Sequence, residues 1–176
     1  MRPMEQAKRP VTALAGWYGH PLHPALVAVP IGAWIASLVF DIGSHLVHEP
    51  GFLTQGSRWL IGLGVVGAVL AALFGFLGLF AIPTGTTVFR IGLVHMTINL
   101  AVTVAYAIGF VIRGGPAGGP VGWGPLALSV VALAALGVSG YLGGELAYHY
   151  GVRVADEATQ ERGYETTTAK EAKERI

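Results

Sequence analysis

The sequence contains no cysteine among its 176 residues. That absence excludes disulfide bridges, thiolate zinc sites, cysteine nucleophiles and cysteine-ligated iron–sulfur clusters. Any metal ion that this chain binds must therefore take its ligands from histidine, aspartate, glutamate or main-chain oxygen.

Charged residues are also scarce. They make up 12% of the chain, whereas soluble domains carry roughly 25%. Hydrophobic residues account for 53%, the mean hydropathy is +0.59, and there are 26 glycines. This composition indicates an integral membrane protein, in which glycine lets neighbouring helices approach closely. The net charge of +1 gives no sign of nucleic-acid binding.

Four apolar stretches are long enough to cross a bilayer. They run over about residues 24–45, 59–83, 88–112 and 126–148. A helix of about 20 apolar residues covers the ~30 Å of hydrocarbon, and the stretches lack the alternation of a membrane β-barrel. We therefore predict an all-α fold, a four-transmembrane-helix up-down bundle, because each connection is too short for another crossing.

The predicted organisation is a polar lead-in over residues 1–17, a membrane domain over 18–152 and a charged tail over 153–176. Four crossings place both termini and the loop between the second and third spans on one side. The basic residues expected on that side include Arg2, Lys8, Arg9, Arg90, Arg153 and Arg162. The other side carries only Arg58 and Arg113. The positive-inside rule then predicts cytoplasmic termini in the inner membrane.

The first span opens with Gly19-His20-Pro21-Leu22-His23-Pro24. A residue before proline is pushed out of the helical region towards extended geometry. We therefore expect His20 and His23 to be extended, Pro24 to be the first helical residue, and Pro30 to kink the span.

The predicted topology brings polar groups from three distant segments to the terminal side of the membrane. The candidate metal ligands are His20, His23, His95 and His149, and the candidate cofactor-binding residues are Arg90, Asn99, Tyr141, Glu145 and Tyr148. Neutral imidazole is a common ligand of zinc, copper and iron, so this set predicts a haem b or transition-metal site. The structural alternatives are that His23 caps the first span, that His149 anchors the interface, and that Glu145 pairs with Arg90 or Arg153.

A second polar cluster lies at the far ends of the first two spans. Asp41, His45 and His48 have spacings that share one side of a helix, and Arg58 begins the next span on the same membrane face. One interpretation is an Asp41–Arg58 ion pair that closes the hairpin, with both histidines in the headgroup layer. The other is a second ligand site or a proton-entry site.

Several motifs also carry a family resemblance. They are Gly19-His20-Pro21-Leu22-His23-Pro24-Ala25-Leu26-Val27, Pro30-Ile31-Gly32, Phe40-Asp41, His95 with Asn99, Gly143-Gly144-Glu145-Leu146-Ala147-Tyr148, and Gly151-Val152. Over about residues 16–154 the chain resembles the bacterial predicted membrane proteins catalogued as the domain of unknown function DUF2231. Relatives of this kind also occur joined to Rieske iron–sulfur domains, so the resemblance implies a redox setting.

The chain departs from this family pattern at two places. Many members carry a histidine where this chain has Ala28, and many carry Arg-His where it has His149-Tyr150. If the family builds a metal site from those positions, this chain lacks one ligand or uses a shifted one.

The leading hypothesis is a histidine-ligated haem or metal site that serves electron transfer within the lipid bilayer, with a Rieske-type protein or a quinone as redox partner. Two alternatives stay open, and the sequence does not decide whether the protein is an enzyme. One is a non-catalytic membrane subunit that packs against a larger partner. The other is a small proton-coupled carrier or sensor that uses Asp41 and the histidines.

Overall fold

The computed structural model describes residues 2–115 and 118–164. Its four long helices are α3 (Ala28–Gly43), α4 (Gly51–Leu79), α5 (Thr87–Ile112) and α6 (Trp123–Gly144). A short helix, α2 (Leu22–Leu26), precedes α3, and a π-helical turn, η2 (Glu145–His149), continues α6. With these additions, four segments are long and apolar enough to cross a membrane. The predicted all-α fold with four candidate spans is confirmed.

Short elements lie outside the four long helices. They are α1 (Pro3–Lys8), η1 (Ala13–Ala15), β1 (Gly16–Trp17), β2 (His20–Pro21), α7 (Glu157–Glu161) and η3 (Arg162–Tyr164). The two strands are antiparallel, and Gly16 lies opposite Pro21. Because β2 runs directly into α2, this small hairpin sets where the first long segment begins.

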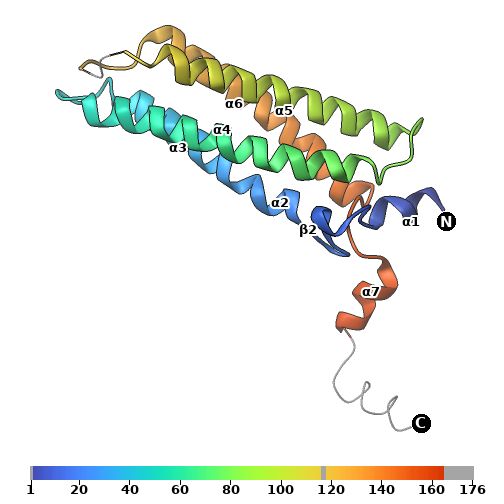
Figure 1. Cartoon of the computed structure of the whole chain (residues 1–176). Helices are drawn as coiled ribbons and strands as arrows, with labels where there is room; N and C mark the ends of the chain where they lie inside the picture. The colour runs from blue at the N-terminus through green and yellow to red at the C-terminus, as the bar shows by residue number, and fades with distance from the viewer. Residues whose placement is uncertain (1, 116–117, 165–176) are drawn as a thin grey trace, which may run out of the picture.

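The four long helices lie side by side, as Figure 1 shows. The loops after α3 and α5 lie at one end of the bundle, and the loop after α4 lies at the other end with α1 and α7. Hydrogen bonds join the segments at each end: Val121 N donates to Ser44 Oγ at 3.1 Å, and Arg153 N donates to the Ala7 carbonyl at 3.0 Å. We call the end with α1 and α7 the terminal end.

The core of the bundle is built around one aromatic stack. Trp34 of α3 lies on Tyr106 of α5 with ring centroids 4.1 Å apart and planes 8° from parallel. The indole of Trp34 fits against Gly64 of α4, where a Cβ atom would lie 2.2 Å from the indole nitrogen. Gly64 therefore lets α3 and α4 approach closely, as the high glycine content predicts.

The outer surface of the bundle is largely apolar. Large hydrophobic side chains that are more than half exposed include Val39, Val66, Leu73, Val104 and Val131. Soluble monomers rarely expose contiguous apolar surface on this scale. These side chains match the hydrocarbon that a membrane would place around the helices.

The first span differs from the sequence expectation in detail. His20 is extended, as predicted, but α2 begins at Leu22, so His23 is helical and Pro24 is not the first helical residue. Pro24 fits because the N–H groups of a first helical turn have no intrahelical partner. Pro30 cannot donate to the carbonyl four residues earlier, and the helix is interrupted at Val27, between α2 and α3.

Candidate functional site

His23 and His95 lie together inside the bundle. His23 belongs to α2 and His95 to α5. Their ring centroids are 6.3 Å apart and their planes are 88° apart. The structure therefore brings together two of the four histidines predicted to share a site.

Each of these imidazoles packs against a neighbouring helix in the same way. Its Nδ1 meets a main-chain carbonyl and its ring lies against a glycine, and we call such a position a histidine seat. His23 Nδ1 lies 2.8 Å from the Ala71 carbonyl oxygen, and a Cβ atom on Gly75 would lie 2.8 Å from the same ring. His95 Nδ1 lies 2.8 Å from the Ser139 carbonyl oxygen, and a Cβ atom on Gly143 would lie 3.0 Å from that ring. In both seats a glycine follows the accepting residue by four positions, so it lies one helical turn further on and leaves space for the ring.

The seats fix the tautomer of both imidazoles. A carbonyl oxygen can only accept a hydrogen bond, so Nδ1 of His23 and of His95 must carry the proton. In the neutral form this leaves the lone pair on Nε2. Histidines that bind metals commonly donate their other ring N–H to a carbonyl or carboxylate in this way. Both rings therefore keep an unprotonated Nε2, the nitrogen through which a histidine of this tautomer can bind a metal.

Asn99 and Ser139 hold His95 more firmly. Asn99 Nδ2 donates to Ser139 Oγ at 2.6 Å and to the His95 carbonyl at 2.8 Å. It also lies 3.3 and 3.5 Å from the two ring nitrogens of His95. An amide nitrogen has two hydrogens, and the shorter contacts use both. The amide therefore lies against the His95 ring and within hydrogen-bond distance of Nε2.

The remaining predicted residues of the terminal end do not join this pair as a metal-binding group. Within residues 2–115 and 118–164, no three His, Asp or Glu side chains are placed to hold a metal ion. The exposed residues are His20, Arg90, Tyr141, Tyr148 and His149, and Glu145 is half-buried. A three-histidine metal site is thus not formed by the described residues.

The π-helical turn η2 changes the register at the end of the fourth span. Tyr150 N donates to the Glu145 carbonyl, five residues earlier, at 3.0 Å. The fourth span therefore ends in a turn that is wider than an α-helical one. His149 packs edge-on against Tyr150, with centroids 4.7 Å apart.

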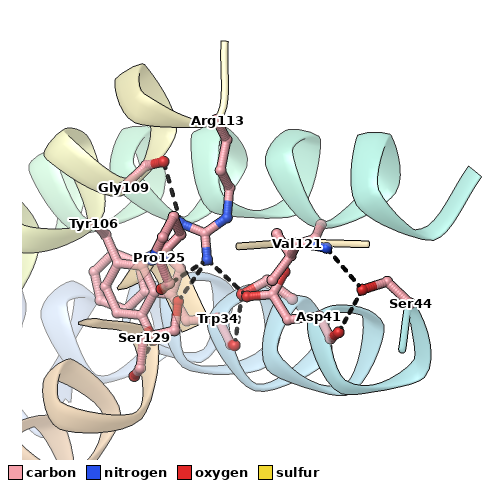
Figure 2. A network of polar contacts seen from close by, with 11 residues as sticks. Trp34, Asp41, Ser44, Tyr106, Gly109, Arg113, Val121, Pro125 and Ser129 are labelled. Carbon is pink, nitrogen blue, oxygen red and sulfur yellow. Dashed lines mark hydrogen bonds and ion pairs between the residues drawn. The ribbon is translucent and has the colours of Figure 1, made fainter. Parts of the chain in front are cut away.

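The second polar cluster is a buried ion pair, shown in Figure 2. Arg113 Nη2 lies 2.7 Å from Asp41 Oδ2, and both side chains are at least 97% buried. Ser57 Oγ donates to the other carboxylate oxygen of Asp41. The alternative in which Asp41 pairs with Arg58 is therefore wrong. Arg58 instead places its guanidinium 4.8 Å from the ring centre of Phe110.

Arg113 also binds groups on α5 and α6. Its Nη1 donates to the Gly109 carbonyl at 3.1 Å, and its Nη2 donates to the Pro125 carbonyl and to Ser129 Oγ, each at 3.0 Å. Through Asp41 and Ser129 the guanidinium links α3 to α6. We call this network, with Ser57, the Asp41–Arg113 clamp.

His45 and His48 do not share a helical face with Asp41, because α3 ends at Gly43. His45 stacks on Trp123 with centroids 4.6 Å apart, and its Nε2 is buried without a hydrogen-bond partner among the described residues. His48 is exposed. The helical spacing predicted for this cluster is therefore wrong.

The family comparison identifies the chain. A family model described as "Predicted membrane protein (DUF2231)" matches residues 19–156. The chain belongs to the DUF2231 family. No curated protein and no solved structure matches it. The match begins at the histidine–proline motif and spans all four long helices, so the DUF2231 resemblance seen in the sequence is confirmed.

In this DUF2231 chain, residues 153–161 form a cap at the terminal end. This cap supports the segment that carries His23. Arg153 has a left-handed backbone (φ 62°), is buried, and donates from Nη2 to the carbonyls of Ala15 and Gly16 at 2.9 and 3.3 Å. Because Gly16 pairs with β2 and β2 leads into α2, these contacts help to position His23.

The cap continues into α7. Asp156 N donates to Tyr18 Oη at 2.7 Å, and the Asp156 carboxylate accepts from Thr159 N at 2.8 Å. The hydrogen bond from Thr159 holds the pKa of Asp156 below its usual value. Above that pKa the carboxylate is charged and caps α7.

Several important residues were not identified as functional from the sequence. The sequence predicts Arg113 only as a basic residue on the side opposite the termini, and it offers Gly143 only as part of a family motif. One signal was available for the glycines: on α4 and on α6 a glycine follows a small residue by four positions, as Gly75 follows Ala71. The helix rotation that turns these positions towards the histidines could not be read from that spacing.

Proposed function

We propose that this DUF2231 protein is a membrane redox protein in which His23 and His95 bind one metal centre. The centre is a haem iron with two axial imidazoles or a copper ion held by the same pair. The observation that supports this proposal is the pair of neighbouring imidazoles, with centroids 6.3 Å apart and each with Nδ1 engaged by a main-chain carbonyl. Imidazole is a ligand that suits both iron and copper.

The spacing of the rings supports one shared metal. Bonds from a metal to an imidazole nitrogen are about 2.0 Å long, so two imidazoles on opposite sides of one ion have centroids roughly 6 Å apart. The observed separation of 6.3 Å is close to this value. A centre with two fixed ligands suits electron transfer, and the proposed redox partner is a Rieske-type protein or a quinone. The exposed Arg90, near the start of α5, is available to a haem propionate.

We place the centre within the bilayer, nearer the cytoplasm. The proposal is an up-down bundle in the inner membrane with both termini cytoplasmic, because most of the basic residues outside the spans belong to the terminal end. At the opposite end Asp41 neutralises Arg113, and this increases the difference in positive charge between the two ends of the bundle. His95 is eight residues after Thr87, about 12 Å along α5 at 1.5 Å per residue.

The two alternatives gain no specific support. Both carboxylate oxygens of Asp41 are occupied, one by Arg113 and one by Ser57. A carboxylate held in this way stabilises the bundle and is a poor proton carrier, so we assign Asp41 to structure.

The test is metal binding by the full chain purified in detergent. The protein would be loaded separately with haem and with copper, and metal per chain would be measured together with the absorption spectrum. We expect one centre per chain in the wild type and none in His23→Ala/His95→Ala. The matched control is His20→Ala/His48→Ala, which removes two exposed histidines and should bind like the wild type.

The two loading experiments distinguish the two metals, since only a haem centre gives a strong Soret band. The proposal is contradicted if the wild type binds neither haem nor copper, or if the His23→Ala/His95→Ala double variant binds as much as the wild type.

A further inference from the structure

We propose that the terminal end binds one phospholipid with an ethanolamine headgroup. The headgroup lies beside Lys8 and Glu157, and one acyl chain enters an adjoining apolar cavity. This site is independent of the two histidine seats and of the proposed metal centre. It follows from two cavities at the end of the bundle where α1 and α7 lie (Figure 1).

The first cavity has a largely apolar lining. Its volume is about 320 Å³. The lining comes from α1, from the turn between α4 and α5 and from the end of η2, and it includes Met4, Ala7, Ile82, Pro83 and Val88. The two candidate spans that flank this turn are apolar, so the turn lies near the boundary of the hydrocarbon. The cavity is therefore within reach of the acyl chain of a lipid in the same leaflet.

The second cavity adjoins the first and has charged groups in its wall. Its volume is about 330 Å³. Met4, His149 and Tyr150 line both cavities, so the two meet along these side chains. Lys8 and Glu157 line the second cavity. Sites that hold small molecules begin at volumes of about 300 Å³. The two cavities together therefore provide the polar and the apolar compartment that an amphiphilic ligand requires.

The ammonium group of Lys8 has capacity for a further anion. The side chain of Lys8 is 8% exposed and that of Glu157 is 77% exposed, and Lys8 Nζ lies 3.5 Å from Glu157 Oε1. That distance is longer than the usual range for a hydrogen bond. Among the described residues it is the one polar contact of the Lys8 side chain. An ammonium group has three N–H donors, so a phosphate could accept from Lys8 while Glu157 stays nearby.

The pair of opposite charges determines which headgroup fits best. The phosphate of an ethanolamine lipid accepts hydrogen bonds from Lys8, and its primary ammonium donates to the carboxylate of Glu157. A glycerol headgroup leaves only the negative phosphate, which Glu157 repels. A choline headgroup carries both charges, but its quaternary nitrogen has no N–H to donate. Lys8 and Glu157 therefore favour ethanolamine over glycerol and choline.

The test is lipid binding by the full chain purified in detergent. The protein would be incubated with equal amounts of dioleoyl phosphatidylethanolamine, phosphatidylglycerol and phosphatidylcholine, which differ only in the headgroup. Native mass spectrometry would measure which lipids remain bound. We expect one phosphatidylethanolamine per chain, preferred at least about threefold over each competitor, a modest factor because the contact with Glu157 is exposed.

Two variants test the roles of the charged pair. Glu157→Gln should lose the preference over phosphatidylglycerol, because the repelling carboxylate is removed. Lys8→Gln should bind all three lipids more weakly, since each has a phosphate. Arg9→Gln and Glu161→Gln change exposed charges outside both cavities and should bind like the wild type. Because the Glu157 side chain is exposed, the comparison of lipids in Glu157→Gln does not depend on the stability of Lys8→Gln.

Soluble glycerophosphoethanolamine separates the lipid from its free headgroup as the ligand. It has no acyl chains to enter the apolar cavity, so at equal concentration it should not displace the lipid. The inference is overturned by equal retention of the three lipids in the wild type, by an unchanged preference in Glu157→Gln, or by displacement of the lipid by the free headgroup. None of these results depends on whether His23 and His95 bind a metal.

Discussion

Two glycines, Gly75 and Gly143, leave room for the two imidazole rings. At either position a methyl group would approach the ring to 2.8 or 3.0 Å, closer than real Cβ contacts allow or nearly so. The ring would have to move, and its hydrogen bond to the carbonyl one turn earlier would weaken. The absence of a side chain at Gly75 and at Gly143 therefore allows the His23 and His95 rings to lie next to each other.

We predict that Gly75→Ala and Gly143→Ala each lower the affinity for the metal by at least about tenfold, the effect typical of disturbing the groups that orient a metal ligand. The matched controls are Gly78→Ala on α4 and Gly140→Ala on α6, where an added Cβ meets no neighbouring atom within 4 Å. The controls should keep the metal and gain up to about 1 kcal/mol of stability from the better helix former. Metal content and thermal unfolding in detergent measure both effects, and equal metal affinity in all four variants would contradict the assigned role of the seats.

At the scale of elements, the Asp41–Arg113 clamp fixes the end of the bundle opposite the terminal end. Asp41 comes from α3, Arg113 follows α5, and the guanidinium also reaches the first turns of α6. A buried pair of this kind adds little net energy by itself. Removing one partner strongly destabilises the folded protein, because the other charge then stays buried without an opposite charge beside it.

We predict that Asp41→Ala destabilises the protein by about 3–5 kcal/mol, because it leaves Arg113 unpaired. Asp41→Leu/Arg113→Met, which removes both charges, should be destabilised less than Asp41→Ala. Thermal unfolding in detergent, analysed as a double-mutant cycle, provides the measurement. Arg58→Met is the control and should have a smaller effect. An Asp41→Ala protein as stable as the wild type would show that the ion pair does not hold the helices together.

At the scale of the whole molecule, the proposed orientation depends on which end of the bundle faces the cytoplasm. The absence of cysteine makes this directly testable, since any introduced thiol is unique. Thr84 lies in the loop after α4, at the terminal end, and Glu49 lies in the loop after α3, at the opposite end. Both residues are exposed.

We expect a membrane-impermeant maleimide added to intact cells to label Glu49→Cys and to leave Thr84→Cys unlabelled until the membrane is permeabilised. The physical reason is the surplus of Arg and Lys at the terminal end, which favours retention on the cytoplasmic side. The reverse labelling pattern would invert the topology, and labelling of both sites from outside would exclude a simple four-span arrangement.

The spans were predictable because their cause is local. A segment that crosses hydrocarbon must be about 20 residues long, apolar and internally hydrogen-bonded. Whether a segment meets these conditions depends only on residues that are close together in the sequence. The family was also readable from the sequence, since Gly19–Val27 forms a distinctive run. For the site, His23 and His95 were predicted as ligands, but His20 and His149 were placed with them only because topology put them at the same end.

The sequence by itself therefore determined the helical class, the number of candidate spans and a set of four histidines that contains the two of the proposed centre. The tertiary structure decided that Arg113, not Arg58, neutralises Asp41, and that glycine seats on α4 and α6 receive the two imidazoles. Both outcomes depend on how far each helix is rotated and where it crosses its neighbours. That rotation is set by packing over the whole bundle, beginning with Trp34 against Gly64 and Tyr106, and no local spacing rule specifies it.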